Sequence, residues 1–187
     1  RARWASWDGS GGEEILERSA RLEALLRPGL IAAVGRTNVG KSTLLNALAG
    51  RSVSIVADEA GVTRDHVGAT LVLDGVAARW VDTAGVMVGR SAIDEAAWVR
   101  AREVIGRADV VVVCGDAASG FVGLEELPAL RGRVVRVGTR GDLGRAEGAD
   151  VVTSAARGEG LGELALAVRR AMVSDADLAS EGVWAFD

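Results

Sequence analysis

Apolar residues occur along this chain in two patterns, as short continuous runs and as longer stretches with three- and four-residue spacing. Continuous runs of about four to eight residues are typical of strands covered on both faces, whereas the longer spacing is typical of helices with one buried face. Runs and helical stretches alternate, which predicts an α/β fold with a doubly wound, mostly parallel sheet and helices on both faces. The expected strands are 30–34, 67–73, 76–81, 109–114, 134–138 and 151–153, and the expected helices are 10–26, 44–50, 91–108, 124–130 and 161–172.

The runs 67–73 and 76–81 are separated by only Asp74-Gly75. An Asp-Gly pair between two strands is typical of a tight turn, because both residues tolerate a positive φ. We therefore expect one antiparallel hairpin within the otherwise parallel sheet. Residues 51–66, which precede the hairpin, show no sustained periodicity and are expected to form a loop.

A glycine-rich segment, 35–42, follows the expected strand 30–34 and precedes the expected helix 44–50 with the spacing G-x-x-x-x-G-K-[ST]. Amides of such a loop point at phosphate oxygens, Lys41 reaches the β and γ phosphates, and the Ser42 hydroxyl binds Mg²⁺. Lys41 is the only lysine in the chain, which indicates a place where a compact ammonium must fit. The fold class is therefore a P-loop NTPase. The candidate nucleotide-binding residues of this loop are Gly35, Asn38, Val39, Gly40, Lys41, Ser42 and Thr43.

Composition narrows the class of protein further. The chain has 187 residues, 49% of them hydrophobic and 26% charged, as expected for one soluble domain. The formal net charge of -4 does not imply sequence-independent nucleic-acid binding. Cys114 lies in an apolar run and is expected to be a core thiol in a reducing compartment. No apolar run approaches the length of a membrane span and the first residues lack a signal-peptide core, so we expect a cytoplasmic protein without a membrane partner.

Five motifs in order resemble those of the translation-factor-like (TRAFAC) GTPases of the TrmE-Era-Der group, and most of all the nucleotide-binding domain of the tRNA-modification GTPases (MnmE/TrmE). The resemblance covers about residues 30–172. It implies binding and hydrolysis of GTP to GDP and phosphate with Mg²⁺, and a conformational switch. In the second motif, Asp82-Thr83-Ala84-Gly85, Asp82 is implied to hold the Mg²⁺ shell through water, and the Gly85 amide to meet the γ-phosphate. Thr63 resembles the switch threonine that closes on Mg²⁺ when the γ-phosphate is present.

The segment 139–142 resembles the base-specificity motif Asn/Thr-Lys-x-Asp. A carboxylate at Asp142 accepts both donors of guanine, N1-H and the exocyclic amine, and adenine lacks this pair. Arg140 stands in place of the usual lysine and still covers the base plane, whereas Thr139 lacks the amide of an asparagine, which lowers the expected affinity. Ser154 and Ala155 resemble the last motif, in which the Ala155 amide faces guanine O6.

Val86 occupies the place where Ras-like enzymes have the glutamine that orients the attacking water. Intrinsic hydrolysis is therefore expected to be slow, near about 10⁻⁴ s⁻¹. The resemblance implies help from potassium, held partly by Asn38, and from a nucleotide-dependent homodimer, although Val62 replaces a threonine that normally completes the potassium cage.

The same resemblance places a water-orienting carboxylate at Asp94. Its alternative is a helix cap with Ser91, and both interpretations remain open. His66, the only histidine, is expected to be a solvated loop residue rather than a base. The catalytic candidates are thus Lys41, Thr63, Gly85 and Asp94.

We expect three parts: a leader with an amphipathic flanking helix over 1–29, a GTP-binding domain over 30–173, and a C-terminal tail over 174–187. The chain begins with an arginine rather than a methionine, which suggests a portion of a longer protein. A tRNA or a tRNA-modifying partner is expected only through domains outside this sequence. Two other hypotheses stay open, a nucleotide-binding module with little or no turnover and an Era/Der-like ribosome-assembly GTPase.

Overall fold

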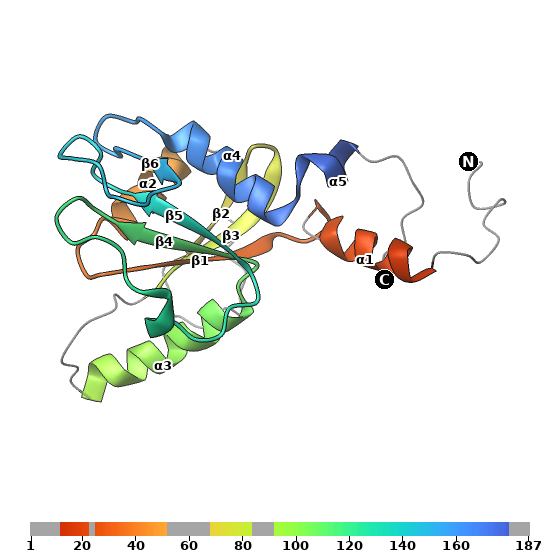
Figure 1. Ribbon diagram of the computed structural model, residues 1–187, viewed down its shortest axis with the longest axis horizontal. Coiled ribbons are helices and arrows are strands. Elements are labelled where there is room, and N and C mark those ends of the chain that lie inside the picture. The colour runs from red at the N-terminus through yellow and green to blue at the C-terminus, as the bar shows by residue number, and fades with distance from the viewer. Residues whose placement is uncertain (1–11, 23–24, 52–67, 84–91, 180–187) are drawn as a thin grey trace.

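A six-stranded sheet forms the centre of the protein (Figure 1). The computed structural model describes residues 12–22, 25–51, 68–83 and 92–179. The strand order is β2-β3-β1-β4-β5-β6. As the sequence predicts, β2 runs antiparallel to β3, and the other pairs are parallel. The strands are β1 Gly29–Gly35, β2 Gly68–Leu73, β3 Val76–Asp82, β4 Val110–Gly115, β5 Arg133–Gly138 and β6 Val151–Val152; the helices are α1 Gly12–Leu22, α2 Lys41–Arg51, α3 Ala92–Arg107, α4 Leu161–Met172 and α5 Asp175–Ala179.

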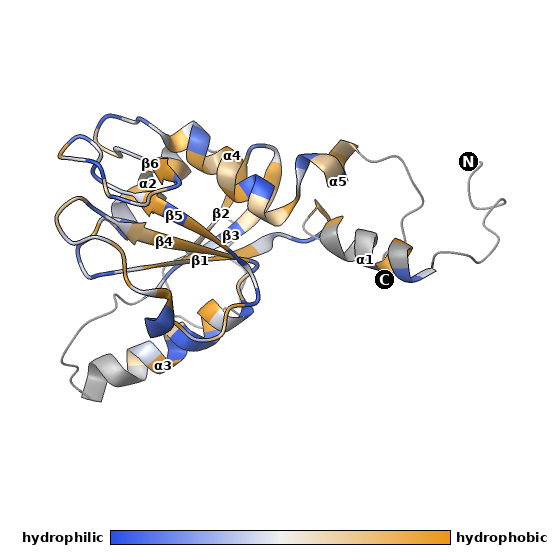
Figure 2. Ribbon diagram, viewed as in Figure 1, coloured by the Kyte–Doolittle hydropathy of each residue, from blue (hydrophilic) through white to orange (hydrophobic). Residues whose placement is uncertain are grey.

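Helices cover both faces of the sheet (Figure 1). In β1, Ile31 and Ala33 pack on the face covered by α2 and α4, while Ala32 and Val34 pack on the face covered by α3. Side chains alternate between the faces of a strand, so a strand buried on both sides must be apolar at every position. The continuous runs in the sequence are therefore the central strands, which Figure 2 shows as the most hydrophobic ribbons.

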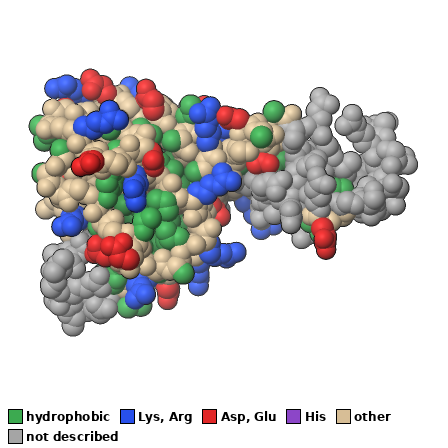
Figure 3. Space-filling model, in the orientation of Figure 1, with side chains coloured by type: hydrophobic (Ala, Val, Ile, Leu, Met, Phe, Trp, Pro, Cys, Tyr) green, Lys and Arg blue, Asp and Glu red, His purple; other side chains and the backbone are tan. Residues whose placement is uncertain are grey.

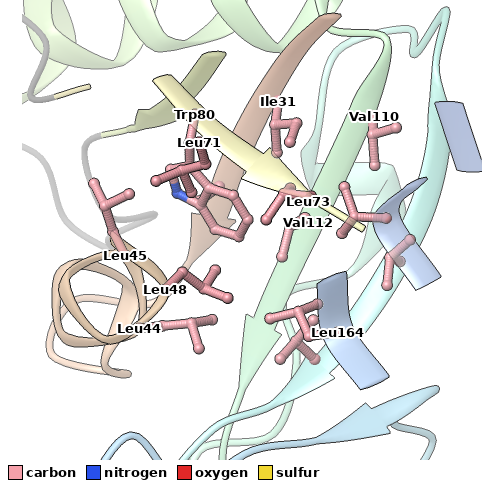
Figure 4. Packing of buried hydrophobic residues seen from close by; sticks show 14 of the residues in the cluster. Ile31, Leu44, Leu45, Leu48, Leu71, Leu73, Trp80, Val110, Val112 and Leu164 are labelled. Atoms are coloured by element: carbon pink, nitrogen blue, oxygen red, sulfur yellow. The ribbon is translucent and has the colours of Figure 1, made fainter. Parts of the chain in front are cut away.

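The larger core lies between the sheet and α2 and α4 (Figure 4). Trp80 of β3 is fully buried and points toward Leu45 and Leu48 of α2. On the same face, Leu164 of α4 packs with Val112 of β4. This core holds α2 against β1, so the segment joining them starts and ends at fixed points.

The prediction of a helix over 124–130 is wrong. Only a single 3₁₀ turn, Leu124–Glu126, is present. Pro128 explains the difference, because a proline disfavours the helical conformation in the residue before it. Leu127 accordingly has an extended backbone, with φ -91° and ψ 158°.

The start of the expected C-terminal tail is ordered as α5, which lies beside α1 at the end of the sheet away from the carboxyl ends of the parallel strands (Figure 1). Ser174 begins α5 as an N-cap, since its Oγ accepts the Asp177 amide hydrogen at 3.0 Å and donates to the Asp177 carboxylate at 2.6 Å. The Arg169 guanidinium of α4, itself buried, binds Asp175 of α5 and, at 2.9 Å, Asp74 of the hairpin turn. The first residues of the expected tail are thus attached to the core.

The surface carries charges of both signs. Figure 3 shows acidic and basic side chains intermingled on one face, consistent with the small net charge. None of the helices in the described part of the chain is long and apolar enough to cross a membrane.

The core predicts a stability difference between two leucines. Leu164→Ala removes a fully buried side chain and should lower the free energy of unfolding by about 2–5 kcal/mol, because a cavity remains. Leu143→Ala, at a side chain that is 77% exposed, should change it by less than about 0.5 kcal/mol. Urea denaturation without nucleotide measures both, and equal losses would contradict this account of the core.

Candidate nucleotide-binding site

The loop between β1 and α2 has a backbone that its glycines make possible. Gly35 has φ 155°, and a Cβ there would lie 2.4 Å from the Cys114 carbonyl oxygen of β4. Gly40 has φ 102°, and Asn38 has φ 62°, a left-handed conformation that asparagine tolerates better than most residues. The loop leads directly into α2, whose first turn carries no acidic side chain. The amides of such a loop and the dipole of α2 together suit a bound phosphate.

Lys41 is the first residue of α2, and its ammonium lies against the preceding loop. Its side chain is 8% exposed, and its ammonium donates to the carbonyl oxygens of Gly35 at 3.4 Å and Arg36 at 3.2 Å. These carbonyls hold the positive charge within the loop, at the position where the motif places phosphate oxygens.

Ser42 and Asp82 form a second polar pair beside the loop. The Ser42 Oγ donates to Oδ2 of Asp82 at 2.5 Å. Parallel pairing sets Asp82 of β3 opposite Ala33 of β1, and the next residue, Thr83, donates its hydroxyl to the Ala33 carbonyl at 2.7 Å. The end of β3 is thereby held next to the start of α2.

The other carboxylate oxygen of Asp82, Oδ1, is buried without a hydrogen-bond partner among the described residues. An unpaired buried carboxylate oxygen is costly, and a hydrated Mg²⁺ ion would satisfy it. The described residues contain no group of three His, Cys, Asp or Glu side chains able to hold a metal by themselves. The Ser42–Asp82 pair fits Mg²⁺, which is usually bound by one or two protein ligands together with phosphates and water.

A pocket of about 260 Å³ opens next to the loop. It joins residues from three of the predicted motifs, of which the phosphate loop lies about a hundred positions before the other two in the sequence. Among the predicted site residues it is lined by Gly40, Thr43, Thr139, Arg140, Asp142 and Ala155. The pocket has four other lining residues that belong to none of the predicted motifs and were not predicted as site residues: Leu44, Leu143, Thr153 and Ala156.

Asp142 is oriented by Ser154. The Ser154 hydroxyl donates to Oδ1 of Asp142 at 2.6 Å, and Ser154 itself is 1% exposed. This hydrogen bond, with a smaller effect of the Arg157 charge, lowers the pKa of Asp142 below its ordinary value. The carboxylate is therefore ionised at neutral pH, and each of its oxygens keeps further acceptor capacity.

Thr139 joins the loop that follows β5 to the phosphate loop between β1 and α2. Its buried hydroxyl lies 2.5 Å from the Val39 carbonyl oxygen and 3.1 Å from that of Gly115, and it donates its one hydrogen to either. Arg140 adds a second link, because its Nη2 donates to the Asn38 carbonyl oxygen at 2.5 Å. Thr139 and Arg140, which stand in place of the usual Asn-Lys pair, therefore still join the two loops.

Several predicted residues fall wholly or partly outside the described part of the chain. Thr63 and Gly85 lie outside it, as do Val62, His66 and Val86. Asp94 lies in the first turn of α3, but its side chain is outside the described part. The catalytic roles of Thr63, Gly85 and Asp94 remain predictions.

Cys114 is fully buried in β4, and burial raises the pKa of its thiol to about 12. It stays a neutral thiol, so the expectation of a core cysteine is confirmed.

A family model described as 50S ribosome-binding GTPase matches residues 30–136. The chain belongs to this GTPase family. It is 44% identical over 149 residues to the tRNA modification GTPase MnmE of Acidiphilium cryptum (strain JF-5), which covers 77% of this chain and 33% of that protein. It is 37% identical over 178 residues to MnmE of Neisseria meningitidis serogroup C (strain 053442), and this match covers 88% of this chain and 39% of that protein. The chain thus spans about a third of the length of the curated relatives it matches.

Two solved structures share its fold. A point variant of Era from Aquifex aeolicus, bound to GDP and AlF4-, has a TM-score of 0.62 at 27% identity, covering 86% of this chain and 60% of that one. The G domain of the T. maritima FeoB iron transporter has a TM-score of 0.56 at 28% identity, and the match covers 77% of this chain and 98% of that one. The protein is therefore a P-loop GTPase domain homologous to that of MnmE. Membership of this family implies binding of GTP and GDP, and Mg²⁺ is typical of the family.

The Asp142–Ser154 contact gives a test. Ser154→Ala should raise the pKa of Asp142 toward its ordinary value, because it removes the hydroxyl that stabilises the carboxylate. Carbonyl-carbon NMR titration of the aspartates measures this, and Arg157→Gln, which removes only a nearby charge, should raise the pKa less. An unchanged pKa in Ser154→Ala would mean that the hydrogen bond is not made in solution.

Proposed function

We propose that this chain is the nucleotide switch of a tRNA-modification GTPase, with the residues of the two loops in the roles that their chemistry suggests. One observation carries the assignment of roles. The Lys41 ammonium, the Ser42–Asp82 pair and the Asp142 carboxylate follow the carboxyl ends of β1, β3 and β5, which lie at one edge of the sheet. The first two lie at the glycine-rich loop, and Asp142 lines the pocket next to it. This edge is where open α/β sheets bind ligands.

In this proposal, Lys41 and the loop amides neutralise the β and γ phosphates as charge develops during hydrolysis. Ser42 and Asp82 would hold Mg²⁺, which would offset the negative charge of the phosphates. Asp142 would select guanine, with Ser154 fixing its orientation. The proposal further assigns Thr63 to the Mg²⁺ shell, the Gly85 amide to the γ-phosphate and Asp94 to the attacking water, and we expect Thr63 and Gly85 to change position with the γ-phosphate.

Hydrolysis depends on Lys41 in this scheme. Lys41→Ala should lower single-turnover GTP cleavage at least about a hundredfold, because one buried cation at the phosphates is lost. Arg79→Ala, which removes an exposed cation of β3 outside the loop, is the matched control and should cleave GTP at the wild-type rate. Unchanged cleavage in Lys41→Ala would remove the lysine from the mechanism.

A second candidate function is a module that binds GTP or GDP with little turnover, and Val86, in place of a water-orienting glutamine, favours it. Potassium held partly by Asn38 and a nucleotide-dependent homodimer are the activating factors that we propose for the enzyme. Single-turnover cleavage in potassium and then in sodium separates these cases. We expect faster cleavage in potassium, whereas tight binding without phosphate release in either salt would support the module.

The biological setting is proposed from the relatives. Two of them are named tRNA modification GTPases, so we propose that the chain serves tRNA modification in the cytoplasm and meets tRNA or a modifying partner through segments that match the rest of those proteins. Likeness to Era makes ribosome assembly the secondary proposal. Association of the protein with tRNA fractions rather than ribosomal particles would favour the first.

A further inference from the structure

Asp116 lies just past the end of β4 and belongs to none of the nucleotide motifs. It is 6% exposed, and its Oδ1 accepts three hydrogen bonds, from the Ser119 amide at 2.7 Å, the Ser119 hydroxyl at 2.7 Å and the Ala118 amide at 3.2 Å. The Ser119 hydroxyl is the largest of the effects that lower the pKa of this carboxyl group. The side chain is therefore ionised and held in one orientation.

The free side of this carboxylate faces Arg140. Oδ2 of Asp116 lies 3.1 Å from Nη1 of Arg140, and the other terminal nitrogen, Nη2, donates to the Asn38 carbonyl oxygen at 2.5 Å. The two terminal nitrogens of the guanidinium thus contact different loops. A lysine has a single nitrogen for both acceptors, whereas the planar fork of arginine fits two acceptors at fixed angles.

Two features of Arg140 require such a support. Its side chain is 48% exposed, and an exposed ion pair normally gains little, since two long side chains must be ordered. Its backbone has φ 53°, which is unfavourable for a residue other than glycine or asparagine. Because Ser119 already orders Asp116, only the arginine has to be ordered, and the ion pair can hold Arg140 toward the phosphate loop.

We propose that Asp116 is a positioning residue that acts through Arg140: it holds the guanidinium on the Asn38 carbonyl and so keeps the phosphate loop closed on the base pocket. Bound guanine nucleotide then leaves slowly, because release requires the two loops to separate. The inference rests on the proposed function of this pocket as the guanine site, which Arg140 lines.

The test is the dissociation rate of a fluorescent GDP analogue from Asp116→Asn, Arg140→Gln and the double variant. Asparagine keeps the Oδ1 acceptor for Ser119 and removes the charge that faces Arg140. We expect each single variant to release the analogue about tenfold faster, as for loss of a partly exposed charge-assisted hydrogen bond. The double variant should be no faster than Arg140→Gln alone, since Asp116 acts through Arg140.

The control is Asp150→Asn, another carboxylate that accepts a backbone hydrogen bond, from Arg136 at 2.7 Å, and it should release the analogue at the wild-type rate. A melting temperature in Asp116→Asn equal to that of the wild type excludes general loosening. If that variant does not fold, Ser119→Ala, which loosens the carboxylate without removing it, should give a smaller increase in rate.

Three results would overturn the inference. If Asp116→Asn releases the GDP analogue at the wild-type rate, the ion pair has no effect on the loops, while the proposed guanine site itself stands. Multiplying effects in the double variant, about a hundredfold, mean that Asp116 acts independently of Arg140. A wild-type protein that does not bind the GDP analogue overturns the proposed site as well, so the two failures are distinguishable.

Discussion

The candidate site depends on the attachment of the phosphate loop to the loop that follows β5. The buried Thr139 hydroxyl reaches the Val39 carbonyl oxygen, and the Arg140 guanidinium reaches that of Asn38. Both acceptors are backbone atoms of the phosphate loop, so the base pocket and the phosphate site share one set of hydrogen bonds. A nucleotide that spans the two would find their separation already set, which limits the entropy lost on binding.

The sheet makes this attachment possible. Parallel pairing of β1 with β3 and β4, and of β4 with β5, brings four strand ends to one edge in a fixed register. Asp82 lies opposite Ala33, and Gly115 lies opposite Gly138, just before Thr139. The apolar residues on both faces of these strands hold the register, because a slip by one residue would exchange the two buried faces.

Local patterns predict most of the fold. The continuous runs locate the strands within one or two residues, and the Asp74-Gly75 turn identifies the hairpin, because short-range geometry determines both. The segment 124–130 misleads, since its leucines have helical spacing while Pro128 prevents the helix. The helix α5 is missed although Ser174 and Asp177 have capping spacing, because five residues are too few for a periodic pattern.

The sequence by itself determined the chemistry of the phosphate loop, because its glycines, Lys41 and Ser42 act from eight consecutive residues between a strand and a helix. It also predicted Asp142 as the carboxylate that selects guanine, and the structure places this residue in the lining of the pocket. Only the tertiary structure showed that Ser154 orients Asp142, that Oδ1 of Asp82 is buried without a partner among the described residues, and that Asp116 meets Arg140. The two side-chain contacts join residues 12 and 24 positions apart, and strand register and side-chain direction, which no local pattern records, decide whether they form.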